Sequence, residues 1–137
     1  MLGSDTELKQ LLESTRTIAV VGLSANPERA SHEVALYLKS HGYSIIPVNP
    51  ACKEVLGLKC YPSLRDVPVK IDLVDVFRRS EEVMPAVEDA IAVGARAVWL
   101  QLGVIAPHAI AHAEAAGLRT VMDRCTKIEH RRLLARG

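Results

Sequence analysis

The sequence predicts an α/β protein with a Rossmann-like fold, in which helices cover both faces of a doubly wound, five-stranded parallel sheet. Five short apolar runs rich in Val and Ile recur along the 137 residues, and amphipathic helical patterns lie between most of them. Gly42, Gly94 and Gly117 each follow a helical pattern and precede an apolar run, where a helix C-cap needs positive φ. Strands covered on both faces have this apolar character, and right-handed crossovers place helices on both faces.

The apolar runs give the five predicted strands. They cover residues 17–23, 43–48, 71–77, 95–102 and 118–122. Their short length and their β-branched content are typical of buried strands rather than of buried helices. Alternation of such strands with helices predicts parallel pairing.

The helical patterns carry apolar residues at spacings of three and four, which puts these residues on one face. Ser31 is a good N-cap for the second helix, and the fixed φ of Pro107 suits the first turn of the fourth. Residues 50–68 contain Gly and Pro without a clear period, so we expect the second crossover to be mostly loop. The predicted helices cover residues 5–14, 31–41, 82–93, 107–116 and 126–135.

Composition argues for one compact domain over residues 1–137, since 49% of the residues are apolar. The 17 basic and 16 acidic residues are mixed along the chain and leave a net charge of +1, which argues against nucleic-acid and membrane partners. No apolar stretch suggests a membrane span or a signal sequence, so we expect a cytoplasmic protein. The three cysteines lack C-x-x-C spacing, which predicts reduced thiols rather than disulfides or a zinc site.

The loop after the first strand has the character of a phosphate site. Gly22 can turn the chain and admit a ligand close to the backbone, and Ser24 can donate to phosphate oxygens. Arg29 adds a bidentate donor, although an isolated loop arginine is as often only solvated. The loop lacks the second and third glycines of G-x-G-x-x-G, and Asn49 stands where a ribose-binding carboxylate is usual. The pattern therefore predicts a phosphate-bearing ligand other than NAD.

Five segments should meet at one edge of the sheet, because ligands of open α/β sheets bind beyond the carboxyl ends of the strands. These segments are residues 22–31, 49–53, 77–80, 101–105 and 123–125.

The stretches VVGLSANPERASHEVALYLKSHGY, IIPVNP, VDVFRRSEEV, WLQLGV and MDRCTKIEHRRL, spread over residues 18–134, resemble the small single-domain CoA-binding proteins. That family is similar in fold to the CoA-binding domain of the succinyl-CoA synthetase α subunit. The resemblance implies a coenzyme A ligand. The synthetase also has a ligase domain with a phosphorylated histidine, for which 137 residues leave no room, so we transfer no synthetase activity.

The resemblance also implies roles for residues on the predicted rim. It assigns phosphate binding to Gly22, Ser24 and Arg29, and the edge of the nucleotide to Asn49, Pro50 and Lys53. It assigns the other wall of the nucleotide site to Phe77 and Arg78, and the exit of the pantetheine arm to Gln101 and Gly103.

Few residues favour catalysis or a metal. His108 and His112 can share a helix face, but no third ligand is evident, so we expect no metal site. Asp72 and Asp75 alternate within a strand, where we expect them to mark its ends or to accept backbone N–H groups. Cys125, near an arginine and a helix start, is either a reactive thiol or a buried packing residue.

The predicted function is binding of CoA or an acyl-CoA without catalysis, as a sensor or carrier. Two alternatives stay open. One is a nucleotide-dependent transferase or oxidoreductase that uses the same pocket, and the other is a domain that chiefly binds an unknown protein partner.

Overall fold

The computed structural model describes residues 1–135 and contains a five-stranded, wholly parallel sheet in the order β2-β1-β5-β6-β7. The last two residues of the predicted domain, 136–137, lie outside the described part. The predicted α/β class and doubly wound sheet are confirmed. The strands are β1 (Thr17–Val21), β2 (Ser44–Val48), β5 (Leu73–Val76), β6 (Ala97–Leu100) and β7 (Arg119–Val121).

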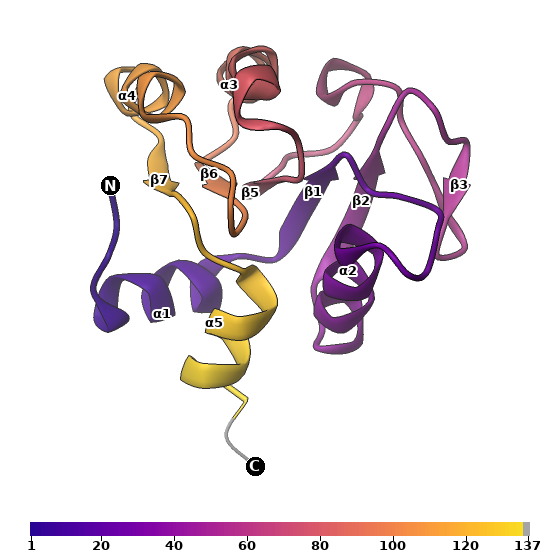
Figure 1. The fold of residues 1–137 in the computed structure, drawn as a ribbon, viewed down its shortest axis with the longest axis horizontal. Coiled ribbons are helices and arrows are strands. Elements are labelled where there is room, and N and C mark those ends of the chain that lie inside the picture. Colours follow the sequence, from indigo (N-terminus) through magenta and orange to yellow (C-terminus); the bar gives the residue numbers. More distant parts are fainter. Residues whose placement is uncertain (136–137) are drawn as a thin grey trace.

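Helices form a layer on each side of the sheet (Figure 1). Alternate strand residues supply the two cores: Ile18 and Val20 pack with α1, α2 and α5, whereas Ala19 and Val21 pack with α3 and α4. This alternation is the two-residue period of a strand whose faces are both covered. The helices are α1 (Asp5–Ser14), α2 (Ala30–Ser40), α3 (Val83–Ala92), α4 (Pro107–Ala115) and α5 (Thr126–Leu133).

The crossover from β2 to β5 has no α-helix, as the sequence predicts for residues 50–68. It contains a hairpin of β3 (Glu54–Val55) and β4 (Leu58–Lys59), and a 3-10 turn, η1 (Leu64–Asp66). Tyr61 then lies along the edge of β2, since its N–H donates to Pro47 O (2.9 Å) and its carbonyl accepts from Asn49 N (2.9 Å). The hairpin was not predicted, because two-residue strands are too short to show a period.

The start of α2 corrects one expectation. The helix begins at Ala30, one position before the predicted range, and its N-cap residue is Arg29, two positions before the predicted cap Ser31. The Arg29 side chain makes no capping hydrogen bond, so it does not accept from the N–H groups of the first turn of α2. A second short 3-10 turn, η2 (Ser80–Glu82), precedes α3.

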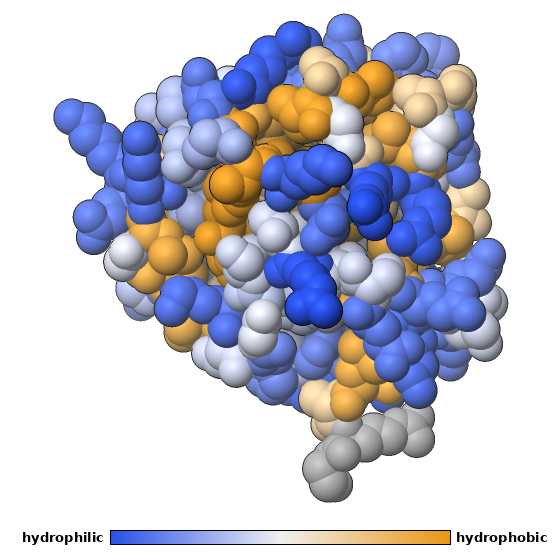
Figure 2. Space-filling model, turned by 180° about the vertical axis from the view of Figure 1, so that it is seen from behind, coloured by the Kyte–Doolittle hydropathy of each residue, from blue (hydrophilic) through white to orange (hydrophobic). Residues whose placement is uncertain are grey.

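The surface is mixed in polarity. On the face seen in Figure 2, hydrophobic side chains show between hydrophilic ones that cover most of the area. None of the helices formed by residues 1–135 is long and apolar enough to cross a membrane.

Candidate functional site

The strand order reverses at β1, and this reversal positions the site. From β1 the chain moves outward to β2, and it then returns to β5 on the other side of β1. The loops that leave β1 and β5 therefore diverge, and they open a crevice at the carboxyl ends of these strands. The predicted rim forms around this crevice.

A polar pocket of about 410 Å³ lies beyond the end of β1. It brings together five of the predicted site residues, and it adds the first two residues of α2. The polar pocket is lined by Gly22, Ser24, Arg29, Ala30, Ser31, Asn49 and Phe77.

Gly22 shapes this pocket through its backbone. It has φ +86°, and a Cβ at this position would lie 2.1 Å from the carbonyl oxygen of Phe77. Its N–H donates to Val48 O (2.8 Å), so the residue joins the ends of β1, β2 and β5. Only glycine combines this φ with so close a backbone approach. The backbone geometry of the fold alone therefore requires glycine at position 22, whether or not a ligand is bound.

Two serine hydroxyls face the polar pocket. Ser24 Oγ accepts from Asn26 N (3.0 Å), and Ser31 Oγ accepts from Ser24 N (3.0 Å). Within residues 1–135 neither hydroxyl donates a hydrogen bond, so each proton is available to an acceptor in the pocket. Ser31 thus organises the loop instead of capping α2.

The N-terminus of α2 also opens into the polar pocket. The first intrahelical bonds to Arg29 O come from His32 and Glu33, which leaves the N–H groups of Ala30 and Ser31 without an intrahelical acceptor. α2 has eleven residues, and its positive end favours an anion here. Arg29, an exposed residue, also lines the pocket. The pocket is therefore suited to a phosphate group.

Asn49 lies at the polar pocket, but its side-chain amide forms hydrogen bonds with the surrounding loops. Its Nδ2 donates to Leu23 O (3.0 Å), and its Oδ1 accepts from Ala51 N (3.0 Å). The side chain thereby links the loop after β1 to the loop after β2.

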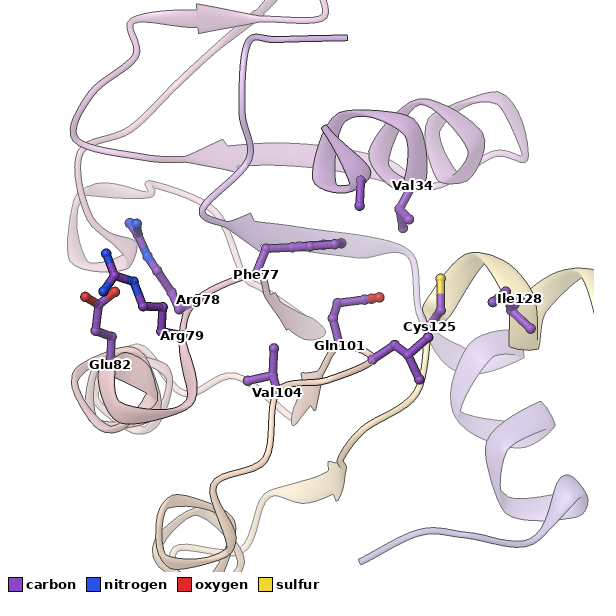
Figure 3. A pocket seen from close by; sticks show the side chains of 11 residues that line it. Val34, Phe77, Arg78, Arg79, Glu82, Gln101, Val104, Cys125 and Ile128 are labelled. Atoms are coloured by element: carbon purple, nitrogen blue, oxygen red, sulfur yellow. The ribbon is translucent and has the colours of Figure 1, made fainter. Parts of the chain in front are cut away.

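An apolar cavity of about 670 Å³ adjoins the polar pocket, and both are lined by Ala30 and Phe77. It contains three of the predicted residues, Phe77, Arg78 and Gln101. Figure 3 shows its charged side chains at the end near α3 and Cys125 at the opposite end, near α5. The remaining lining residues are Val34, Arg79, Glu82, Leu102, Val104 and Ile128.

The other predicted residues lie away from these two spaces. Pro50 lines a smaller hollow of about 160 Å³ between the ends of β2 and β5, to which Arg78 also contributes. Lys53 is exposed beside the β3–β4 hairpin and lines none of the three hollows. Gly103 donates its N–H to Asp123 Oδ1 (2.7 Å), and its neighbours Leu102 and Val104 line the cavity in its place.

A buried polar network underlies the apolar cavity. Asp75, which is fully buried, accepts from Gln101 Nε2 (2.7 Å) and from Thr126 Oγ1 (2.9 Å). Gln101 Nε2 also donates to Thr126 Oγ1 (2.8 Å). Burial raises the pKa of Asp75 to about 7, although the two hydrogen bonds lower it. The expectation that Asp75 marks a strand end or accepts backbone N–H groups is wrong, whereas Asp72 does accept the N–H groups of Arg16 and Thr17.

The raised pKa of Asp75 predicts a pH dependence of stability. The Asp75 carboxyl group holds its proton more tightly in the folded state than in the unfolded state, where its pKa is near 3.8. The contribution of Asp75 to the free energy of unfolding therefore falls as pH rises toward about 7. Between pH 5 and pH 8, the free energy of unfolding of wild type should fall by about 2 kcal/mol relative to Asp75→Asn. Urea denaturation of both proteins at the two pH values measures this change, and an unchanged difference would contradict it.

Sequence reasoning missed the apolar part of the site. Val34 and Ile128 lie outside the predicted rim segments, and only the packing of α2 against α5 brings them to one cavity. Cys125 was placed on the rim, and it is a half-buried lining residue.

His108 and His112 are exposed on α4. Among the residues described, no group of three or more His, Cys, Asp or Glu side chains is placed to hold a metal ion.

Comparison with known proteins gives the family. The CoA binding domain family matches residues 16–131. The chain belongs to this family. It is 40% identical over 127 residues to the uncharacterized protein YneT of Bacillus subtilis, a match that covers 93% of this chain and 94% of YneT. It also matches the solved structure of a hypothetical protein from Pyrococcus horikoshii OT3 with a TM-score of 0.94 and 45% identity, over 96% of this chain and 93% of that one.

A more distant similarity concerns a larger enzyme. The chain is 36% identical over 73 residues to the ADP-forming acetate–CoA ligase of Methanocaldococcus jannaschii. The match covers 53% of this chain and only 10% of the ligase. The chain is thus related to one part of that ligase.

Proposed function

We propose that the protein binds coenzyme A or an acyl-CoA. The observation that carries this proposal is that the polar pocket and the apolar cavity share Ala30 and Phe77 in their walls. A ligand that joins charged phosphates to a long and less polar arm matches this combination. The family and the similarity to part of an acetate–CoA ligase support it.

The three hollows suggest an arrangement for the ligand. The diphosphate would occupy the polar pocket, where the Ser24 and Ser31 hydroxyls and the first amides of α2 are available. The adenine would lie between the ends of β2 and β5, against Pro50 and Arg78. The pantetheine arm would pass Phe77 toward Gln101.

The site favours CoA over NAD. An NAD site commonly has a carboxylate after the second strand for the ribose diol, and Asn49 occupies that position with its amide engaged by Leu23 and Ala51. We propose that the protein is a cytoplasmic sensor or carrier that binds its ligand without turnover.

Arg29→Gln tests the phosphate assignment. Loss of one charged donor from an exposed site should weaken CoA binding by about tenfold. Arg119→Gln is the matched control, because Arg119 is exposed at the start of β7, at the opposite edge of the sheet. Calorimetric titration of both variants and wild type with CoA measures the effect. Equal affinity of Arg29→Gln and wild type would remove Arg29 from the site.

A further inference from the structure

The two ends of the apolar cavity differ in chemistry. Arg78, Arg79 and Glu82 gather at its end near α3, and the end between α2 and α5 is formed by Val34, Cys125 and Ile128 (Figure 3). Two apolar side chains that line the cavity are open to solvent, since Leu102 is 65% exposed and Ile128 is 46% exposed. A ligand that covers them would gain the free energy of apolar burial.

Gln101 is a buried side chain that supplies an acceptor to this apolar setting. It is only 4% exposed, and its amide orientation follows from its neighbours. Thr126 Oγ1 gives its own proton to Asp75, so both Thr126 and Asp75 act as acceptors toward the Gln101 NH2 group.

The amide oxygen of Gln101 is consequently left for the cavity. In the described part of the chain, Gln101 Oε1 has no hydrogen-bond partner. Figure 3 shows the oxygen end of this side chain within the ring of lining residues. An acceptor that a buried side chain holds open to the cavity favours a ligand that presents an N–H group beside an apolar segment.

We propose that the apolar end of the cavity holds the hydrocarbon chain of an acyl-CoA, a specificity that rests on the CoA binding proposed above. Gln101 Oε1 accepts the last amide N–H of the pantetheine arm, and the chain beyond the thioester packs against Val34, Cys125 and Ile128. Asp75 and Thr126 are positioning residues, because they fix the orientation of the Gln101 amide without lining the cavity.

The polarity of the pantetheine arm argues against its filling the cavity by itself. The arm carries two amides and a hydroxyl, and each polar group that is buried without a partner costs free energy. The apolar end offers the acceptor Gln101 Oε1 and otherwise presents mainly hydrocarbon surface. A hydrocarbon chain has no polar group to satisfy there.

Titration of wild type with CoA, acetyl-CoA and hexanoyl-CoA tests this specificity. Hexanoyl-CoA should bind at least about tenfold more tightly than CoA and acetyl-CoA, because its additional methylene groups are removed from water. Ile128→Asp places a carboxylate on the cavity wall and should bring the ratio of hexanoyl-CoA to CoA affinity close to one. The matched control is Leu36→Asp, on an exposed helical leucine outside the cavity lining, and it should keep the wild-type ratio.

The outcomes separate the two proposals. Binding of CoA with no gain for hexanoyl-CoA would overturn the acyl specificity and leave CoA binding in place. A gain that persists in Ile128→Asp would overturn the location of the chain. Absence of binding by all three ligands would overturn both the acyl specificity and the proposed function.

Discussion

Gly22→Ala should lower the free energy of unfolding by about 3 kcal/mol or more. Two costs combine at this residue: φ is +86°, and the added Cβ would meet the carbonyl oxygen of Phe77 at 2.1 Å. Relief of the overlap requires the loops after β1 and β5 to separate, and these loops form the polar pocket. CoA binding should therefore weaken together with stability.

Gly117→Ala separates the two costs of the Gly22 substitution. Gly117 has φ +90°, but a Cβ added at this residue would have no heavy atom within 4 Å. The free energy of unfolding of Gly117→Ala should fall by only about 1 kcal/mol, which is the cost of the positive φ alone. Urea denaturation measures both variants. Equal losses would show that close approach to Phe77 does not explain the glycine at position 22.

Ala30→Asp should abolish most CoA binding and leave the fold intact. Ala30 is the exposed first residue of α2, and it lines both the polar pocket and the apolar cavity. A carboxylate at a helix N-terminus is stabilising by about 0.5 kcal/mol, but it repels a phosphate bound at the same amides. We expect CoA affinity to fall by about 100-fold, with the free energy of unfolding unchanged or slightly higher.

Ala30→Asn is the matched control for this charge, because asparagine has the shape of aspartate without its charge. It should retain CoA affinity within about threefold of wild type, as expected of a neutral change at an exposed position. Calorimetry with CoA and urea denaturation provide the two readouts. Equal loss of affinity in the Asp and Asn variants would mean that the size of the side chain at position 30, and not its charge, weakens binding. This result would argue against an anion at the start of α2.

The fold was predictable because its signals are local. Each apolar run covers one strand, and Gly42, Gly94 and Gly117 all take positive φ at helix ends, as their positions predicted. The β3–β4 hairpin and the bridge of Tyr61 to β2 were not predictable, because the strands have two residues each and the bridge is a single residue pair.

The candidate site was predictable only in part. The loop after β1 lies at the end of the first strand, so Gly22, Ser24 and Arg29 meet by local geometry. Ser31 was misassigned because a serine before a helical pattern is a normal N-cap, whereas here the loop amide of Ser24 uses its hydroxyl. Asp75 and Gln101 are 26 residues apart, and only the pairing of β5 with β6 brings them together.

Calorimetric titration of the wild-type protein with CoA, alongside dephospho-CoA, NAD and ATP, tests the proposed ligand most directly. We expect saturable binding of CoA and weaker binding of dephospho-CoA, because the 3′-phosphate adds a charged group to be recognised. Saturable binding of NAD or ATP without binding of CoA would contradict the proposal.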